Sequence, residues 1–217
     1  KAPKHKSSEK FVAELKTRLR KFQEKAEKAG KKSGGRKGIR KEGFQFVLIG
    51  FANSGKSTLL SKLTNAQSKI SEHPFSTAQP EIGTFNFEGI KAQVIDLPSL
   101  GSEKFDIGIA NNADCLIFVI ENLDEIEKLE KLIPRARGKK IIVLNKVDRL
   151  SSLELRKLEA TIKSKRINGL SVSAENSYNL DKLKQKMIET TRLIKVYMKE
   201  PGKSPSPIPM VMRENST

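Results

Sequence analysis

The feature that most constrains this chain is a glycine-containing loop that follows a short apolar run at residues 44–49 and precedes a helical pattern at residues 56–63. The loop fits the pattern G-x-x-x-x-G-K-[ST]; its residues are Gly50, Phe51, Ala52, Asn53, Ser54, Gly55, Lys56 and Ser57, with Thr58 next on the helix. Between a strand and a helix, this pattern is typical of a phosphate-binding P-loop. The sequence therefore predicts a P-loop nucleotide-binding domain.

The residue types of this loop suit phosphate chemistry. Glycines let the backbone wrap around phosphate oxygens, while amide N–H groups and the start of the helix supply positive potential. We expect the Lys56 ammonium to reach the β- and γ-phosphates and the Ser57 hydroxyl to bind Mg²⁺.

The rest of the chain alternates between apolar runs and amphipathic segments of helical length. The apolar runs cover residues 92–95, 115–120, 141–144 and 170–172, and the helical segments 123–132, 152–163 and 179–194. Such alternation predicts an α/β fold, a P-loop NTPase with a doubly wound, mostly parallel sheet. Residues 85–87 and 91–95 flank Glu88-Gly89-Ile90, which predicts a hairpin and one antiparallel edge strand.

A base-recognition pattern follows the run at residues 141–144. Asn145, Lys146 and Asp148 form N-K-x-D, and the Asp148 carboxylate can accept hydrogen bonds from N1–H and the N2 amine of guanine. Adenine offers neither donor, so it would leave the carboxylate unsatisfied. We therefore expect GTP or GDP as the ligand, with an ATPase as the weaker alternative.

The next loop carries a second base-recognition pattern. Ser173, Ala174 and Glu175 resemble an S-A-x loop whose backbone contacts the guanine oxygen, although a simple strand-to-helix turn would have the same sequence.

Two further segments are candidates for sensing the γ-phosphate. Asp96-Leu97-Pro98-Ser99 resembles D-x-x-G, in which the aspartate holds Mg²⁺ through water and the glycine N–H meets the γ-phosphate. Ser99 occupies the glycine position and is less free in φ/ψ; we expect Gly101 to take over part of the hinge role. Thr77 has the spacing of a switch residue that binds Mg²⁺, with Thr58 and Ser76 as alternatives.

Charge is concentrated at the N-terminus. Residues 1–42 carry 16 Lys and Arg against 5 Asp and Glu, out of a net charge of +17 for the chain. Residues 9–29 show one apolar stripe at helical spacing, and a Gly- and Lys-rich linker follows. A basic helical arm of this kind favours an RNA or ribosomal partner, with a solubilising helix as the alternative.

The domain organisation follows from these changes in composition. We expect a basic arm and linker at residues 1–43, a nucleotide-binding domain at 44–193, and a Pro-rich segment at 194–217 that is a tail or the start of a further small domain. The single cysteine, Cys115, lies in an apolar run, which predicts a buried thiol and suits the reducing cytoplasm. No apolar run approaches the ~20 residues of a membrane span, so no membrane association is expected.

The run from Phe44 to Asp96 resembles the Obg and developmentally regulated GTP-binding (DRG) families of GTPases. Residues 50–60 are similar to their G-F-P-[NS]-V-G-K-S-[ST]-L-L, and residues 73–83 to their Y-x-F-T-T-x-x-P-x-x-G switch. Residues 194–202 resemble the opening of their C-terminal TGS domain, an RNA- or ribosome-associated module. Ala52 replaces the usual proline and Ser99 the usual glycine.

The resemblance implies a GTP-hydrolysing switch in translation or ribosome function. Leu100 stands where related enzymes have a water-orienting glutamine, which implies slow hydrolysis. Asn53 matches the P-loop asparagine that helps hold K⁺ in related GTPases, so we expect K⁺ to stimulate turnover; a loop-shaping role for Asn53 is the alternative. Lys56, Thr77 and Asn53 are thus the candidate catalytic residues. The alternative function is a nucleotide-gated RNA- or ribosome-binding module with little hydrolysis.

Overall fold

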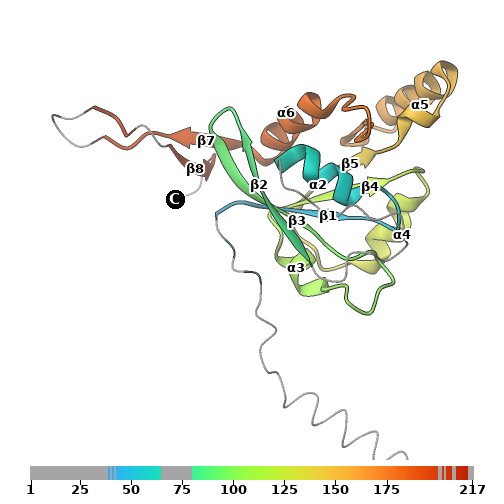
Figure 1. Ribbon diagram of the computed structural model, residues 1–217, viewed down its shortest axis with the longest axis horizontal. Coiled ribbons are helices and arrows are strands. Elements are labelled where there is room, and N and C mark those ends of the chain that lie inside the picture. Colours follow the sequence, from blue (N-terminus) through green and yellow to red (C-terminus); the bar gives the residue numbers. More distant parts are fainter. Residues whose placement is uncertain are drawn as a thin grey trace, which may run out of the picture. The chain divides into compact units, whose positions relative to one another are not determined.

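The computed structural model of the chain describes residues 43–64, 80–199 and 209–214, together with residues 39, 41, 202 and 204–206. The chain divides into two units, residues 1–40 and residues 41–217. The predicted helix at 9–29 lies outside the described residues. Within the second unit, six strands form one sheet in the order β2-β3-β1-β4-β5-β6 (Figure 1).

The apolar runs of the sequence form the parallel strands of the sheet. These are β1 (Gln45–Ile49), β3 (Ile90–Asp96), β4 (Cys115–Ile120), β5 (Lys139–Leu144) and β6 (Gly169–Ser171). β1 pairs in parallel with both β3 and β4, and β4–β5 and β5–β6 are also parallel. All residues of β1 and β4 are buried, which explains why both read as continuous apolar runs rather than alternating ones. The predicted buried thiol of Cys115 is confirmed.

The predicted hairpin is confirmed at one edge of the sheet. β2 (Glu81–Phe87) pairs antiparallel with β3 through a turn at Glu88 and Gly89, whose φ angles are +51° and +80°. Two consecutive positive φ values give the turn the twist that tight hairpins need.

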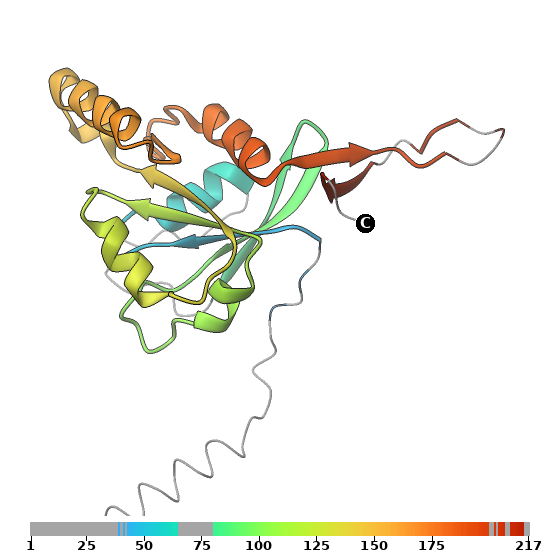
Figure 2. The same cartoon turned by 180° about the vertical axis from the view of Figure 1, so that it is seen from behind.

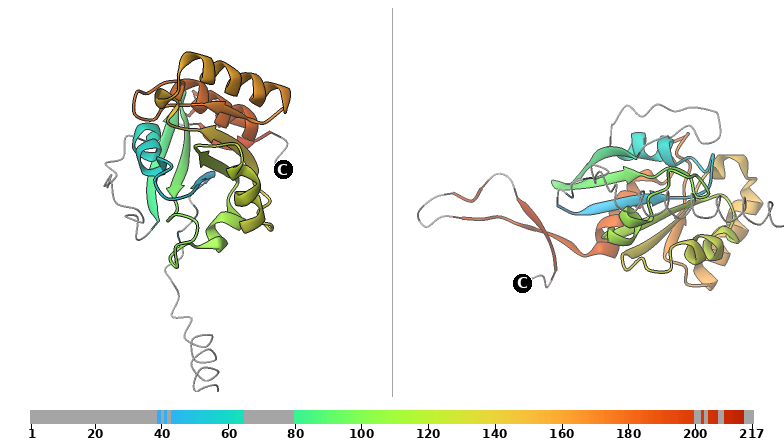
Figure 3. Two further views of the ribbon diagram at one scale, coloured as in Figure 1. Left: turned by 90° about the vertical axis from the view of Figure 1, so that its right-hand side faces the viewer. Right: turned by 90° about the horizontal axis from the view of Figure 1, so that it is seen from below.

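Helices cover both faces of the sheet, so the predicted α/β fold with a mostly parallel sheet is confirmed (Figures 1 and 3). One face carries α2 (Lys56–Thr64) and α6 (Leu180–Thr191), and the other carries α3 (Ile107–Asn112) and α4 (Glu125–Leu132). α5 (Ser152–Ser164) packs against β6 and begins with a capping box between Ser151 and Glu154. None of the helices in the described ranges is long and apolar enough to cross a bilayer.

Two elements differ from the sequence-based prediction. The segment predicted as one helix to residue 194 ends at Thr191, because Arg192 takes a left-handed conformation with φ of +51°. Strand β7 (Leu193–Val196) then begins and pairs antiparallel with β8 (Met210–Arg213) (Figure 2). The second element is α3, which was not predicted; it has only six residues and is capped by the Asp106 side chain.

The ribbon of β7 and β8 is anchored at its base. Leu193 belongs to the hydrophobic core, and Lys195 Nζ donates to the Glu88 carbonyl at 2.6 Å. The core itself lies between the sheet and the α2–α6 layer, where Phe46 and Phe85 are fully buried and meet edge to face at 5.8 Å. This packing fixes β1 and β3, whose carboxyl ends carry the predicted site.

Candidate functional site

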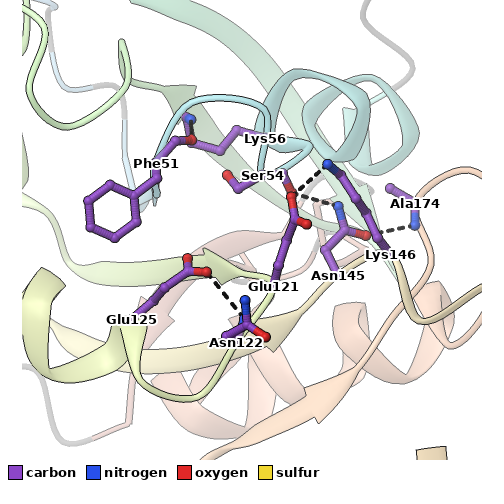
Figure 4. Close-up of polar contacts among 9 residues, drawn as sticks. All are labelled: Phe51, Ser54, Lys56, Glu121, Asn122, Glu125, Asn145, Lys146 and Ala174. Atoms are coloured by element: carbon purple, nitrogen blue, oxygen red, sulfur yellow. Dashed lines mark hydrogen bonds and ion pairs between the residues drawn. The ribbon is translucent and has the colours of Figure 1, made fainter. Parts of the chain in front are cut away.

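The glycine-containing loop joins β1 to α2 in a shape that larger residues could not adopt (Figure 4). Gly55 has a φ of +88°, and a Cβ there would lie 2.2 Å from Asn145 Nδ2. A Cβ on Gly50 would lie 2.3 Å from the Val119 carbonyl oxygen. The two glycines of the pattern therefore allow the loop to approach the loops that follow β4 and β5.

The Lys56 side chain lies inside this loop. Its ammonium donates to the carbonyls of Gly50 at 3.2 Å and Phe51 at 2.9 Å, with the Ser99 hydroxyl at 3.4 Å. Burial lowers the pKa of Lys56, and the charge of Asp96 partly opposes that shift. A buried ammonium held only by neutral oxygens can exchange these partners for anionic phosphate oxygens, which form stronger hydrogen bonds.

Ser57 and Asp96, the two predicted Mg²⁺ residues that the structure describes, are in direct contact. Ser57 Oγ donates to Asp96 Oδ2 at 2.6 Å, although the residues lie on different elements. Asp96 is fully buried, and its Oδ1 accepts no hydrogen bond among the described residues. A hydroxyl and a carboxylate with an unsatisfied oxygen are hard ligands of the kind that Mg²⁺ prefers, so these residues fit the ion.

The environment of Asp96 gives a testable pH dependence. Burial raises its pKa from 3.8 to about 6, opposed by the charge of Lys56 and the Ser57 hydrogen bond and assisted by the charge of Glu81. Because the folded state binds this proton more tightly than the unfolded state, stability falls as pH rises from about 4 to about 6. We expect Asp96→Asn to raise the melting temperature of the nucleotide-free protein at pH 7 and to have little effect near pH 4.

Mg²⁺ binding should show the opposite pH dependence, because the metal requires the ionised carboxylate. We expect Mg²⁺-dependent GDP affinity to weaken by up to about tenfold per pH unit below pH 6 in the unmodified chain. Thermal unfolding and GDP titration across this range measure both effects. A less stable Asp96→Asn variant at pH 7 would contradict the assigned cost of the buried charge.

Asn145 joins three loops of the site. Its Nδ2 donates to the Ser54 carbonyl in the P-loop at 2.9 Å, and its Oδ1 accepts from the Ala174 backbone N–H at 3.0 Å (Figure 4). Asn145 is buried, so its amide is satisfied entirely by protein. The first residue of N-K-x-D therefore has a positioning role, holding the P-loop and the S-A-x loop at a fixed separation.

Asp148 is exposed next to these loops and is oriented by a neighbour. Ser173 Oγ donates to Asp148 Oδ1 at 2.5 Å and itself accepts from the Asn176 backbone N–H at 3.2 Å. A cavity of about 140 Å³ lies here; it is lined by Gly55, Thr58, Asn145, Lys146, Asp148, Arg149, Ala174 and Glu175. The predicted guanine-recognition residues thus surround one cavity that adjoins the P-loop helix.

One residue of this region was missed by the sequence reasoning. Glu121 Oε1 accepts from Lys146 Nζ at 2.6 Å (Figure 4). Lys146 has a φ of +61°, a strained value for lysine, and the ion pair holds its side chain toward β4. The available signal was the position of Glu121 directly after β4, since carboxyl ends of adjacent parallel strands meet at one edge.

The D-x-x-G region is closed onto the P-loop. Leu100 N–H donates to the Gly50 carbonyl at 3.2 Å, and the Leu100 side chain is buried. Gly101 has a φ of +90°, whereas Ser99 does not have a positive φ. The conformation that favours glycine therefore occurs at Gly101, two residues after the expected position. Thr77 lies outside the described residues.

Comparison with known proteins shows which proteins the domain resembles. Residues 45–146 match the family model described as 50S ribosome-binding GTPase. A GTP-binding protein of Methanocaldococcus jannaschii is 24% identical over 301 residues, which cover 100% of this chain and 77% of that protein. GTPase Obg of Endomicrobium trichonymphae is 33% identical over 164 residues, covering 65% of this chain and 38% of that protein.

Solved structures show the same fold at lower identity. Era bound to MgGDPNP and part of 16S ribosomal RNA has a TM-score of 0.59 at 22% identity, covering 78% of this chain and 63% of Era. The G domain of the Thermotoga maritima FeoB transporter has a TM-score of 0.53 at 24% identity. The match covers 69% of this chain and 99% of the FeoB domain.

The extent of these matches defines what is shared. The alignment to the Methanocaldococcus protein is longer than this chain, so that relative contains segments with no counterpart here. The chain spans under half the length of the Obg relatives it matches. The chain thus has the fold of P-loop GTPases, and its nucleotide-binding domain is similar in sequence to GTP-binding proteins such as Obg.

Proposed function

We propose that this chain is a Mg²⁺-dependent guanine-nucleotide switch that hydrolyses GTP slowly and acts on RNA or the ribosome in the cytoplasm. The observation that carries the nucleotide part is the bridge made by Asn145 between Ser54 and Ala174. It couples the phosphate loop to the base loops, so that a bound guanine nucleotide contacts both at once.

In this proposal the metal ligands are Ser57, Asp96 and Thr77. The contact between Ser57 and Asp96 supports the first two. Thr77 would join them only when a γ-phosphate is present, and this makes the segment between α2 and β2 the switch. Bound Mg²⁺ would neutralise phosphate charge during transfer.

Slow hydrolysis is supported by Leu100. An apolar, buried side chain cannot orient the attacking water as glutamine does in faster GTPases. The same observation favours the second candidate function, an RNA- or ribosome-binding module that is gated by nucleotide and barely hydrolyses it.

The RNA part rests on the basic N-terminal segment. Residues 1–42 carry 16 Lys and Arg against 5 Asp and Glu, so this arm would contact phosphates without reading bases. The family description and the Era complex with ribosomal RNA point in the same direction for related proteins. We assign the arm to residues 1–43, the GTP-binding domain to 44–193, and the start of a TGS-like segment to 194–217.

The test is GTP turnover with and without ribosomes, in K⁺ and in Na⁺. We expect slow turnover in Na⁺ and stimulation by K⁺ on the order of tenfold, through an Asn53-assisted cation near the transferring phosphate. Asn53→Ala should remove the K⁺ effect while leaving GDP affinity unchanged, because the Asn53 side chain is exposed on the loop.

The outcomes separate the two candidate functions. Ribosome-stimulated turnover well above that of Lys56→Ala supports the switch. Turnover no faster than that variant, combined with GTP-dependent RNA binding, supports the module with little hydrolysis. Equal turnover in Na⁺ and K⁺ rejects the K⁺ site alone.

A further inference from the structure

A second groove lies away from the nucleotide site, between α5 and α6 along the edge strand β6. It encloses about 610 Å³, and residues 167–171 form part of its wall. β6 is the last strand in the sheet order, so within the described residues no strand covers this edge. The groove is therefore a large concave surface at an edge of the sheet, separate from the cavity beside Asp148.

The charges that line this groove are almost all positive. Lys163 lies in the last turn of α5 and Arg166 in the turn after it, and Lys182 and Lys186 lie on α6. Within the described part of the chain, none of the four pairs with a carboxylate. Glu159 is the one acidic residue in the lining, and it already accepts from Ser171 Oγ at 2.7 Å.

The cations come from two elements that line the groove. Lys182 and Lys186 are four residues apart on α6 and so lie on one helix face, whereas Lys163 lies in the last turn of α5 and Arg166 in the turn that follows it. Among the described residues, Lys131 and Lys184 have acidic partners, whereas the four cations of the groove do not and are gathered around one concave surface. Four cations around one groove favour a ligand with repeated negative charge.

We propose that the groove between α5 and α6 binds the phosphodiester backbone of RNA. No aromatic side chain lines it, so it has no surface on which bases could stack, and recognition would be through phosphates. Arg166 supplies a planar fork that matches phosphate geometry. We choose a polyphosphate strand over an acidic peptide because the proposed function already includes an RNA contact, which the family description and the Era complex support. The inference extends the RNA contact of the proposed function and rests on it.

The test compares two double variants of α5 in the full chain. Lys163→Gln/Arg166→Gln removes one wall of the groove, and Arg156→Gln/Lys157→Gln removes the same two residue types from exposed positions of α5 outside it. Binding of an oligouridylate of about 20 nucleotides is measured by fluorescence anisotropy from about 50 to 200 mM salt. Lys182→Gln/Lys186→Gln tests the other wall independently.

We expect each groove variant to lower the slope of log affinity against log salt by about 1.4, at about 0.7 per lost phosphate contact. By the same relation, each groove variant should bind the oligouridylate about 25-fold more weakly near 0.1 M salt. The control variant should lose less than about twofold in affinity. GDP affinity is the folding check, because Asn179 lines the groove and its side chain also holds the Ser171 carbonyl beside the guanine loop.

Four results would overturn the proposal. If the groove and control variants lower RNA affinity equally, only the total charge of the chain matters for binding. If the groove variants still bind RNA but no longer bind polyglutamate, the groove would be reassigned to an acidic polypeptide. RNA binding that survives both groove variants but is lost in Lys31→Gln/Lys32→Gln would leave the arm as the contact and reject the groove alone. Absence of RNA binding by the unmodified chain would reject the proposed RNA function as well.

Discussion

Replacing Lys56 with alanine is expected to reduce GTP and GDP affinity by on the order of 10²–10⁴ and to abolish hydrolysis. The ammonium would make two or more contacts to phosphate oxygens, and each hydrogen bond to a charged group contributes about 1.5–3 kcal/mol. No other described lysine or arginine lies inside the P-loop, so nothing replaces the lost charge.

The same substitution should have little effect on stability. In the nucleotide-free protein Lys56 is buried, its pKa is lowered by that burial, and it contacts only neutral oxygens and the charge of Asp96. Lys56→Ala removes a desolvated charge, although it also leaves Asp96 without a nearby cation. We expect a melting temperature within a few degrees of the unmodified protein, so that the loss of binding is separable from unfolding.

The measurement is titration of a fluorescent GDP together with thermal unfolding. Lys62→Ala is the matched control, since Lys62 lies on the same helix and is exposed. Lys56→Ala affinity within tenfold of the unmodified chain would contradict the assignment of the phosphate loop.

Replacing Asp148 with alanine is expected to remove the preference for guanine over adenine. Asp148 Oδ1 is held by Ser173, and its Oδ2 accepts no hydrogen bond from the described residues, which leaves it for guanine N1–H and N2. Loss of two charge-assisted hydrogen bonds predicts GDP affinity lower by on the order of 10²–10⁴, with ADP affinity nearly unchanged.

Competition between GDP and ADP measures this preference directly. Ser173→Ala is an informative partner variant, because it removes the group that orients Asp148 but keeps the carboxylate. We expect Ser173→Ala to lower GDP affinity by on the order of tenfold, which corresponds to the loss of about one hydrogen bond. Comparable affinity for ATP and GTP in the unmodified chain would instead revive the ATPase alternative.

Much of the fold followed from local patterns. Buried parallel strands need continuous apolar runs, and the runs at residues 92–95, 115–120 and 141–144 lie within β3, β4 and β5. The turn at Glu88 and Gly89 was predictable because few residues other than glycine tolerate its positive φ.

Other elements were not predictable because tertiary packing decides them. Helix α3 is too short to show a period, and α6 ends at Thr191 although residues 193 and 194 continue its apolar pattern. At this point, placing Leu193 in the core and pairing β7 with β8 stabilises the fold more than another helical turn would.

The sequence by itself determined which chemical groups the site contains, because Lys56, Asp96 and Asp148 all belong to motifs a few residues long that follow strands. Parallel strands then bring their carboxyl ends to one edge, which makes the gathering of these motifs predictable. Only the tertiary structure decided their contacts: the Asn145 bridge to Ser54 spans 91 residues. Likewise, the ion pair of Lys146 with Glu121 and the groove between α5 and α6 depend on how separate elements pack, and no local pattern encodes a packing distance.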